Sequence, residues 1–238
     1  YRFDILGSTN DEARNPLYRE GDIIIAERQT AGRGQRGHTW ESAEGKNLAF
    51  SLILEPTFLP INEQFLLSEV IALALVETLG KYGIECRIKW TNDIYAGNKK
   101  IVGVLIEQAL SCERIERTIV GVGINVNQRS FPEDLPNPTS MYMERGREFD
   151  REEVLREFIN ALRRWYDVLE RGDKETVQSS YRKLMYRLDE AHTYYLPTGE
   201  AFTATIRGVR PSGQLCLEHS DGLMREYAFK EVEFKIVK

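Results

Sequence analysis

The sequence has few of the side chains that bind transition metals or form disulfides, with three cysteines and three histidines in 238 residues. Cys86, Cys112 and Cys216 are widely spaced and form no C-x-x-C motif, which argues against a disulfide framework or a zinc site. None of the histidines has neighbouring cysteines or carboxylates at the spacing that metal ligation needs. We therefore expect reduced, structural thiols and no transition metal.

Long hydrophobic runs and an excess of positive charge are also missing. The longest apolar run, at 71–76, is far shorter than the ~20 residues that cross a bilayer, and the N-terminus lacks a basic-then-apolar signal pattern. Lysine and arginine number 32 against 37 acidic residues, giving a net charge of -5, so the overall field does not attract DNA or an acidic membrane. We expect a cytoplasmic protein that binds neither, and an anionic ligand would need a locally basic pocket.

The composition, with 42% hydrophobic and 29% charged residues, is typical of a globular protein. Runs rich in β-branched residues and bounded by turn residues predict strands of one mixed sheet at 22–28, 48–54, 86–90, 101–108 and 117–127. The segment 63–83 is apolar nearly all round a helical wheel, which predicts a buried helix. Apolar residues every three or four positions predict amphipathic surface helices at 151–169 and 174–188.

The pattern changes near Asp189 to short strands separated by "PTG", "RPSG" and "SDG". About 50 residues remain, which suits a small antiparallel barrel or sandwich, with Asp221 and Gly222 closing a hairpin. We therefore predict two domains, a larger one at 1–188 and a small β-barrel domain at 189–238.

The stretch "GRGQRG" at 32–37 matches the G-x-G-x-x-G motif of dinucleotide-binding turns. That motif requires a helix directly after the glycines to hold the pyrophosphate, whereas "HTWESAEGKNLAFSLIL" follows here and continues into a predicted strand. We therefore reject a nicotinamide or flavin site. Arg33 and Arg36 between the glycines suit a flap that folds over an anion, although an exposed hairpin with incidental arginines would read the same.

Two further stretches combine turns, glycines and polar residues. "KWTNDIYAGNKKIVGVLIE" at 89–107 reads as a hairpin whose polar inner face needs partners, and a ligand could supply them. A solvated hairpin around a buried Trp90 is the alternative. In "GVGINVN" at 121–127, the glycines allow close approach of a backbone or a flat ligand, and an edge bulge would explain them equally well.

Together with "STN" at 8–10, these stretches resemble the biotin protein ligases in identity, order and spacing. The resemblance implies an α+β fold, a mixed β-sheet flanked by helices as in class II synthetases and biotinyl/lipoyl ligases, with a C-terminal SH3-like β-barrel. It also implies the short class without an N-terminal DNA-binding domain. The implied ligase forms biotinyl-5'-AMP from biotin and ATP, with magnesium carried by the ATP, and then modifies a lysine of a biotin carboxyl carrier protein or domain. A homodimer stays open.

The resemblance also assigns residues to roles. Those implied to bind biotin are Ser8, Thr9, Asn10, Gln29, Gly32, Arg33, Gly34, Gln35, Lys100, Gly103, Leu105, Gly121 and Gly123. Those implied to bind ATP or the adenylate are Arg36, His38, Trp40, Lys89, Asn92, Asp93 and Asn125. Lys100, Arg33 and Asp93 are the implied catalytic residues, and no protein ligand for the metal is assigned.

The chemistry explains why cations are needed. The biotin carboxylate is ionised at pH 7 and must approach a triphosphate of the same charge sign. Arg33, Arg36, Lys100 and magnesium would neutralise this repulsion, so we expect a small basic cavity in an acidic protein.

Three positions depart from the family pattern. Gln35 and His38 stand where arginines are usual, so Gln35 removes a fixed charge near the adenylate and His38 is charged only in part. Thr91 replaces a usual proline, which affects backbone stiffness.

Two other functions compete with biotin ligation. The first is a lipoate or octanoate ligase, whose acyl group has no ureido ring to match the cluster at Ser8–Asn10. The second is a noncatalytic biotin-sensing protein.

Overall fold

The computed structural model describes residues 1–37, 39–111 and 114–234, and within these ranges the larger sheet has seven strands. Their order is β1 (Arg2–Leu6), β2 (Ile23–Gln29), β3 (Leu48–Leu54), β7 (Arg114–Ile124), β6 (Lys99–Ser111), β5 (Asp93–Ala96) and β4 (Arg87–Lys89). Only the β1–β2 pair of this sheet is parallel among the pairings described, so the mixed sheet is confirmed. β1 was not predicted, because its five residues have no continuous buried face.

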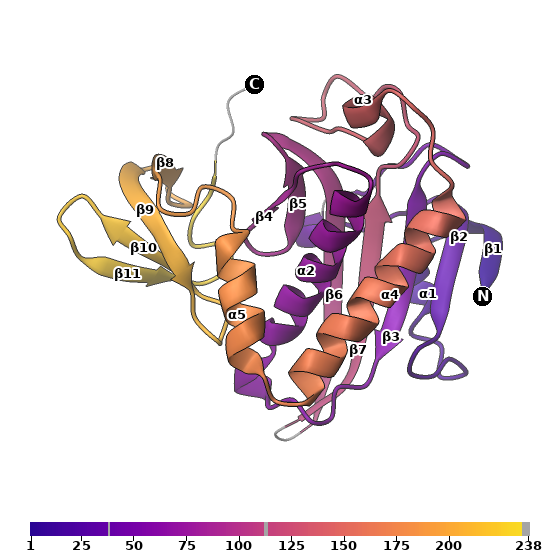
Figure 1. The fold of residues 1–238 in the computed structure, drawn as a ribbon, viewed down its shortest axis with the longest axis horizontal. Coiled ribbons are helices and arrows are strands. Elements are labelled where there is room, and N and C mark those ends of the chain that lie inside the picture. Colours follow the sequence, from indigo (N-terminus) through magenta and orange to yellow (C-terminus); the bar gives the residue numbers. More distant parts are fainter. Residues whose placement is uncertain (38, 112–113, 235–238) are drawn as a thin grey trace.

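Helices cover one face of this sheet, as Figure 1 shows. The helix α2 (Phe65–Lys81) packs against α4 (Arg151–Glu170) and α5 (Lys174–Lys183). Most side chains of α2 are buried, as its all-round apolar pattern predicts. The short elements are α1 (Thr9–Glu12), α3 (Met141–Arg145) and the 3-10 helices η1 (Gln35–Gly37) and η2 (Ile61–Glu63).

The predicted helix at 174–188 is too long, since α5 ends at Lys183. After this end the backbone pairs with β4: Ile88 N donates to Leu184 O at 2.8 Å, and Tyr186 N donates to Ile88 O at 2.8 Å. Arg187 then has a positive φ of 61°, which a right-handed helix does not allow. The apolar residues beyond Lys183 therefore serve a turn between the two sheets.

The second sheet is antiparallel and has four strands among the described residues, in the order β11 (Met224–Tyr227), β10 (Leu215–His219), β9 (Ala201–Val209) and β8 (Ala191–Tyr195). It fits the expected small barrel-like unit, and Asp221 and Gly222 lie in the turn that joins β10 to β11. The side chains of Tyr194, Ile206 and Leu217 belong to the same buried cluster as the helical layer. The domain boundary at 188/189 thus stays a prediction, because the larger buried cluster includes residues on both sides of it.

No helix in the described ranges is long and apolar enough to cross a membrane.

Candidate active site

A cavity of about 700 Å³ opens beside the central strands of the larger sheet. The predicted site residues that line it are Ser8, Thr9, Asn10, Gln29, Arg33, Gly34, Gln35, Trp40, Lys89, Asp93, Lys100, Gly103, Leu105, Gly121, Gly123 and Asn125. Gly32 and Asn92 are not in the lining. His38 and the side chain of Arg36 lie outside the described part of the chain. The fold therefore brings most of the predicted residues to one place.

Two facing glycines form the floor of this cavity. Gly103 on β6 pairs with Gly123 on β7, and the ring of Trp40 lies directly against both. A Cβ atom at Gly103 would lie 2.6 Å from Trp40 Cζ3, and one at Gly123 would lie 2.2 Å from Trp40 Cε2. Only glycine permits so close an approach of a flat group. The residues expected to contact biotin and adenine are thus adjacent.

A chain of hydrogen bonds organises the end of the cavity that α1 contributes. Ser51 Oγ donates to Asn10 Oδ1 at 2.6 Å and also lies 2.8 Å from the hydroxyl of Thr9, and the amide of Thr9 donates to Gln29 Oε1 at 2.8 Å. A Cβ atom at Gly121 would lie 2.2 Å from Asn10 Oδ1. These buried donors and acceptors match a neutral, polar ligand group.

Ser51 was not predicted as a site residue. It is fully buried, at 0% exposure, in the otherwise apolar strand β3. A buried hydroxyl needs a hydrogen-bond partner. The single serine in the apolar run 48–54 was therefore the sequence signal that could have identified it.

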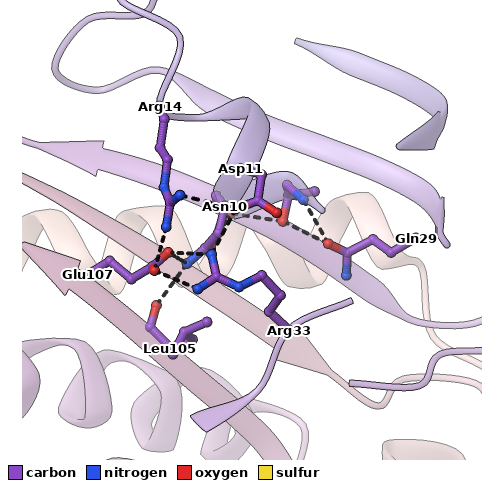
Figure 2. A network of polar contacts seen from close by, with 9 residues as sticks. Asn10, Asp11, Arg14, Gln29, Arg33, Leu105 and Glu107 are labelled. Atoms are coloured by element: carbon purple, nitrogen blue, oxygen red, sulfur yellow. Dashed lines mark hydrogen bonds and ion pairs between the residues drawn. The ribbon is translucent and has the colours of Figure 1, made fainter. Parts of the chain in front are cut away.

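Arg33 forms ion pairs with two carboxylates at the same end of the cavity, shown in Figure 2. Arg33 Nη2 lies 2.9 Å from Glu107 Oε1, and Arg33 Nη1 lies 2.8 Å from Asp11 Oδ1. Burial raises the pKa of Glu107, but the hydrogen bond from Asn10 and the charge of Arg33 outweigh it, so this pKa lies below its ordinary value. Glu107 therefore stays ionised at neutral pH. It ends the quoted stretch at 89–107 but was not among the predicted site residues.

Lys100 is paired with another predicted catalytic residue. Its Nζ lies 2.8 Å from Asp93 Oδ1 across the β5–β6 hairpin and 5.9 Å from the centroid of the Trp40 ring. The backbone of Lys100 is fixed by the loop that follows β7, because its amide donates to Asn137 O at 2.8 Å. The ammonium group is thus held beside the aromatic ring and the glycine floor.

Gln35 anchors the glycine-rich flap to the sheet. Its Nε2 donates to Asn92 Oδ1 at 2.7 Å and to Val104 O at 3.2 Å. This contact explains why Asn92 is only 4% exposed and lies outside the cavity lining. The position of Asn92 suits support of the flap better than contact with a nucleotide.

Asn125 lines the cavity, and only the nitrogen of its side-chain amide is hydrogen-bonded within the described structure. Its Nδ2 donates to Thr139 O at 2.9 Å, and its buried Oδ1 is without a hydrogen-bond partner in the described structure. The second hydrogen of Nδ2 and the oxygen Oδ1 therefore stay available to a ligand.

The described part of the lining does not have the net positive charge that we expected. Among described residues it carries the cations Arg33, Lys89 and Lys100 and the carboxylates of Glu41, Asp93, Asp134 and Glu233. Asp93 lies in the predicted hairpin, and the other acids come from segments that no motif marked. In the described ranges no group of three or more His, Cys, Asp or Glu could hold a metal ion. Within the described lining, the three cations are thus outnumbered by four carboxylates.

The C-terminal segment forms one wall of the cavity. Phe229, Val232 and Phe234 are part of the lining, and the ring of Phe234 lies 5.3 Å from Lys89 Nζ. These residues were not predicted, because long-range packing alone brings them to the site.

Comparison with known proteins agrees with this geometry. The model of the "Biotin/lipoate A/B protein ligase family" matches residues 4–125. The "Bifunctional ligase/repressor BirA" of Bacillus spizizenii is 32% identical over 94% of this chain and 71% of its own length. The "Biotin--[acetyl-CoA-carboxylase] ligase" of Paracoccus denitrificans is 31% identical over 90% of this chain and 92% of its own. The structure of the biotin protein ligase from Aquifex aeolicus in complex with biotin and ATP superposes with a TM-score of 0.84 at 28% identity, covering 98% of this chain and 97% of that one.

Proposed function

The chain belongs to the biotin/lipoate A/B protein ligase family, and from this premise we propose that it is a biotin–protein ligase. It activates biotin with ATP to give biotinyl adenylate and pyrophosphate, and it then transfers the biotinyl group to a lysine of a biotin carboxyl carrier protein. The observation that carries the proposal is one cavity that joins the polar cluster around Asn10, the glycine floor under Trp40, and Lys100.

Each part of the cavity has a task in this chemistry. The cluster around Thr9, Asn10 and Gln29 offers fixed donors and acceptors to the ureido ring of biotin. The glycine floor admits flat groups, and Trp40 supplies a face for stacking against adenine. Lys100 can stabilise the biotin carboxylate and the charge that develops at the α-phosphate.

The first step needs positioning and charge neutralisation, without a general base. A carboxylate oxygen of biotin attacks the α-phosphorus of ATP, and pyrophosphate leaves. In the second step a lysine nitrogen of the carrier attacks the acyl carbon, AMP leaves with the oxygen, and the nitrogen loses a proton. Magnesium carried by ATP would add to the neutralisation by Arg33 and Lys100 when the nucleotide is bound.

The partner and the setting follow from the same proposal. The name of the Paracoccus denitrificans relative, a biotin--[acetyl-CoA-carboxylase] ligase, supports a carboxylase carrier as the acceptor, and we propose that the reaction takes place in the cytoplasm. Sedimentation in an analytical ultracentrifuge would show whether the protein is a monomer or a homodimer.

Pyrophosphate exchange tests the first step. We expect exchange that depends on biotin and magnesium, followed by a mass gain of one biotinyl group when a carrier domain is added. Exchange supported by lipoate or octanoate in place of biotin would make the protein a ligase of the other branch. Biotin binding without exchange would make it a biotin sensor.

Lys100→Ala should lower the rate of exchange by ~100-fold or more, because a fixed charge at the reacting centre is lost. Lys99→Ala is the matched control, since Lys99 is the exposed neighbour on the same strand. Equal activity of the two variants would remove Lys100 from the reaction.

A further inference from the structure

Glu107 lies at the centre of the polar network in Figure 2, outside the cavity lining. Its Oε2 accepts from Asn10 Nδ2 at 2.9 Å and from Arg33 Nη1 at 3.2 Å. Its Oε1 accepts from Arg33 Nη2 at 2.9 Å and from Arg14 Nη2 at 2.8 Å. One carboxylate on β6 therefore holds a side chain of α1 and a side chain of the flap.

We propose that Glu107 is a positioning residue that couples the ureido end of the biotin site to closure of the flap. It orients the Asn10 amide and binds the Arg33 guanidinium, so that a ligand that engages one of them also changes the other. This inference rests on the proposed function, because it takes biotin as the ligand that Asn10 meets.

The orientation of Asn10 depends on Glu107. The Asn10 oxygen accepts from Ser51 Oγ at 2.6 Å, and the nitrogen donates to Glu107 and more weakly to Leu105 O at 3.4 Å. A carboxylate can only accept at neutral pH, so it fixes which end of the amide faces β6. A glutamine at 107 would offer a donor there and would favour the flipped amide.

The flap contact also requires a carboxylate. Arg33 and Glu107 form two nearly parallel hydrogen bonds, at 2.9 and 3.2 Å, the arrangement in which arginine and carboxylate bind best. Arg33 also forms an antiparallel β-bridge with Thr39, which closes the base of the flap. Holding Arg33 thus holds the base of the flap against β6.

The charges of the network are balanced. Arg14 and Arg33 face Asp11 and Glu107, so the positive charge of Arg33 is shared with carboxylates in this structure. An anionic adenylate would compete with them for Arg33. Glu107 thereby also sets how strongly the flap arginine is drawn to the ligand.

Limited trypsin digestion reads the flap directly, because Arg33 and Arg36 are cleavage sites within it. The experiment compares the full-length wild type, Glu107→Gln and the control Arg14→Gln, each alone and with saturating biotin. Arg14 binds the same carboxylate but touches neither Asn10 nor Arg33 in the described contacts. We expect Glu107→Gln to be cut in the flap at least tenfold faster without ligand, to lose most protection by biotin, and to bind biotin at least tenfold more weakly in calorimetry. Arg14→Gln should stay within about twofold of the wild type, as surface charges usually do.

A double-variant cycle separates coupling from general loss of structure. Scored by cleavage after Arg36, which every variant retains, Arg33→Gln added to Glu107→Gln should cost little further flap protection, because both act through one contact. Additive effects, or Glu107→Gln matching Arg14→Gln, would overturn the inference. If Glu107→Gln does not fold, Glu107→Asp takes its place, since the shorter carboxylate cannot reach both partners, and the same outcomes apply. A wild type that neither binds biotin nor exchanges pyrophosphate would refute the proposed function, while the flap cleavage rates without ligand would still test the contact.

Discussion

At the residue scale, the contact between Trp40 and the glycine floor depends on the absence of a side chain at Gly103 and Gly123. Gly123→Ala would place a methyl group 2.2 Å from the Trp40 ring, so the ring must move off the floor. We expect binding of both biotin and ATP to weaken by ~10-fold or more, equivalent to roughly 1.4 kcal/mol, with the fold retained. Calorimetry on the variant checks this.

Gly80→Ala is the control for that substitution, since a Cβ atom there meets no heavy atom within 4 Å. Its binding should equal that of the wild type. Unchanged binding by Gly123→Ala would show that Trp40 can leave the floor without cost.

Gln35 gives a second prediction at this scale, because it stands where the family usually has arginine. Gln35→Arg adds a charge beside the expected adenylate, and a charged hydrogen bond contributes about 1.5 kcal/mol or more. We expect biotinyl adenylate to leave the protein about tenfold more slowly. Release of radiolabelled adenylate after gel filtration measures the rate, and equal rates for variant and wild type would place position 35 away from the phosphate.

Sequence reasoning at the residue scale succeeded where a residue carries its own signature. Glycines, arginines and lysines were found because they cluster in recognisable motifs, and Lys100, Arg33 and Gly123 all reach the cavity. Ser51 and Glu107 were missed, because their importance comes from what lies opposite them in the sheet. The functional roles assigned by resemblance stay predictions.

At the scale of elements, α2 contains a buried carboxyl group that affects stability. Glu69 is 2% exposed and its Oε2 has no hydrogen-bond partner among the described residues. Burial raises the pKa of Glu69 from 4.5 to about 8. The folded protein therefore keeps a proton that the unfolded chain loses, and the free energy of unfolding falls as the pH rises from about 4.5 towards 8.

Glu69→Gln tests this link between burial and pH. The wild type should lose up to about 1.4 kcal/mol of stability per pH unit within that window through this residue, whereas the variant should show a flatter profile. Urea denaturation at pH 5, 6, 7 and 8 measures the two profiles. Parallel profiles would mean that Glu69 titrates normally.

The ends of the helices show where the apolar pattern of the sequence no longer predicts the structure. The apolar patterns that predict helices at 63–83 and 151–169 correspond to α2 and α4 within a few residues, because tertiary packing and local pattern agree there. The end of α5 was missed because backbone pairing with Ile88 competes with the helix. Residues 184–186 bury apolar side chains whether they continue a helix or pair with Ile88. The apolar pattern therefore cannot tell these two conformations apart.

At the scale of the whole molecule, Trp90 joins the two sheets. Its Nε1 donates to Gly213 O at 3.0 Å, and its ring stacks against Phe234 at 6.4 Å between centroids. Trp90→Phe removes that hydrogen bond at a cost of about 1 kcal/mol, which should lower the melting temperature by roughly 2–4 °C. The KM for ATP should rise as well, because Phe234 packs beside Lys89.

Trp165→Phe provides the matched control. Its Nε1 donates to Glu77 at 3.0 Å between two helices, away from the cavity lining. Its melting temperature should fall by a similar amount while the KM for ATP stays constant. If the KM for ATP rose in both Trp90→Phe and Trp165→Phe, the rise would be explained by the loss of stability alone.

The cavity wall formed by Phe229, Val232 and Phe234 faces residues from the opposite end of the chain, including Ser8. During synthesis a ribosome must therefore release residue 234 before the wall can close. A nascent chain that has already formed the larger sheet still lacks the cavity wall at Phe229, Val232 and Phe234. Loss of residues 229–234 would leave this side of the cavity open to water.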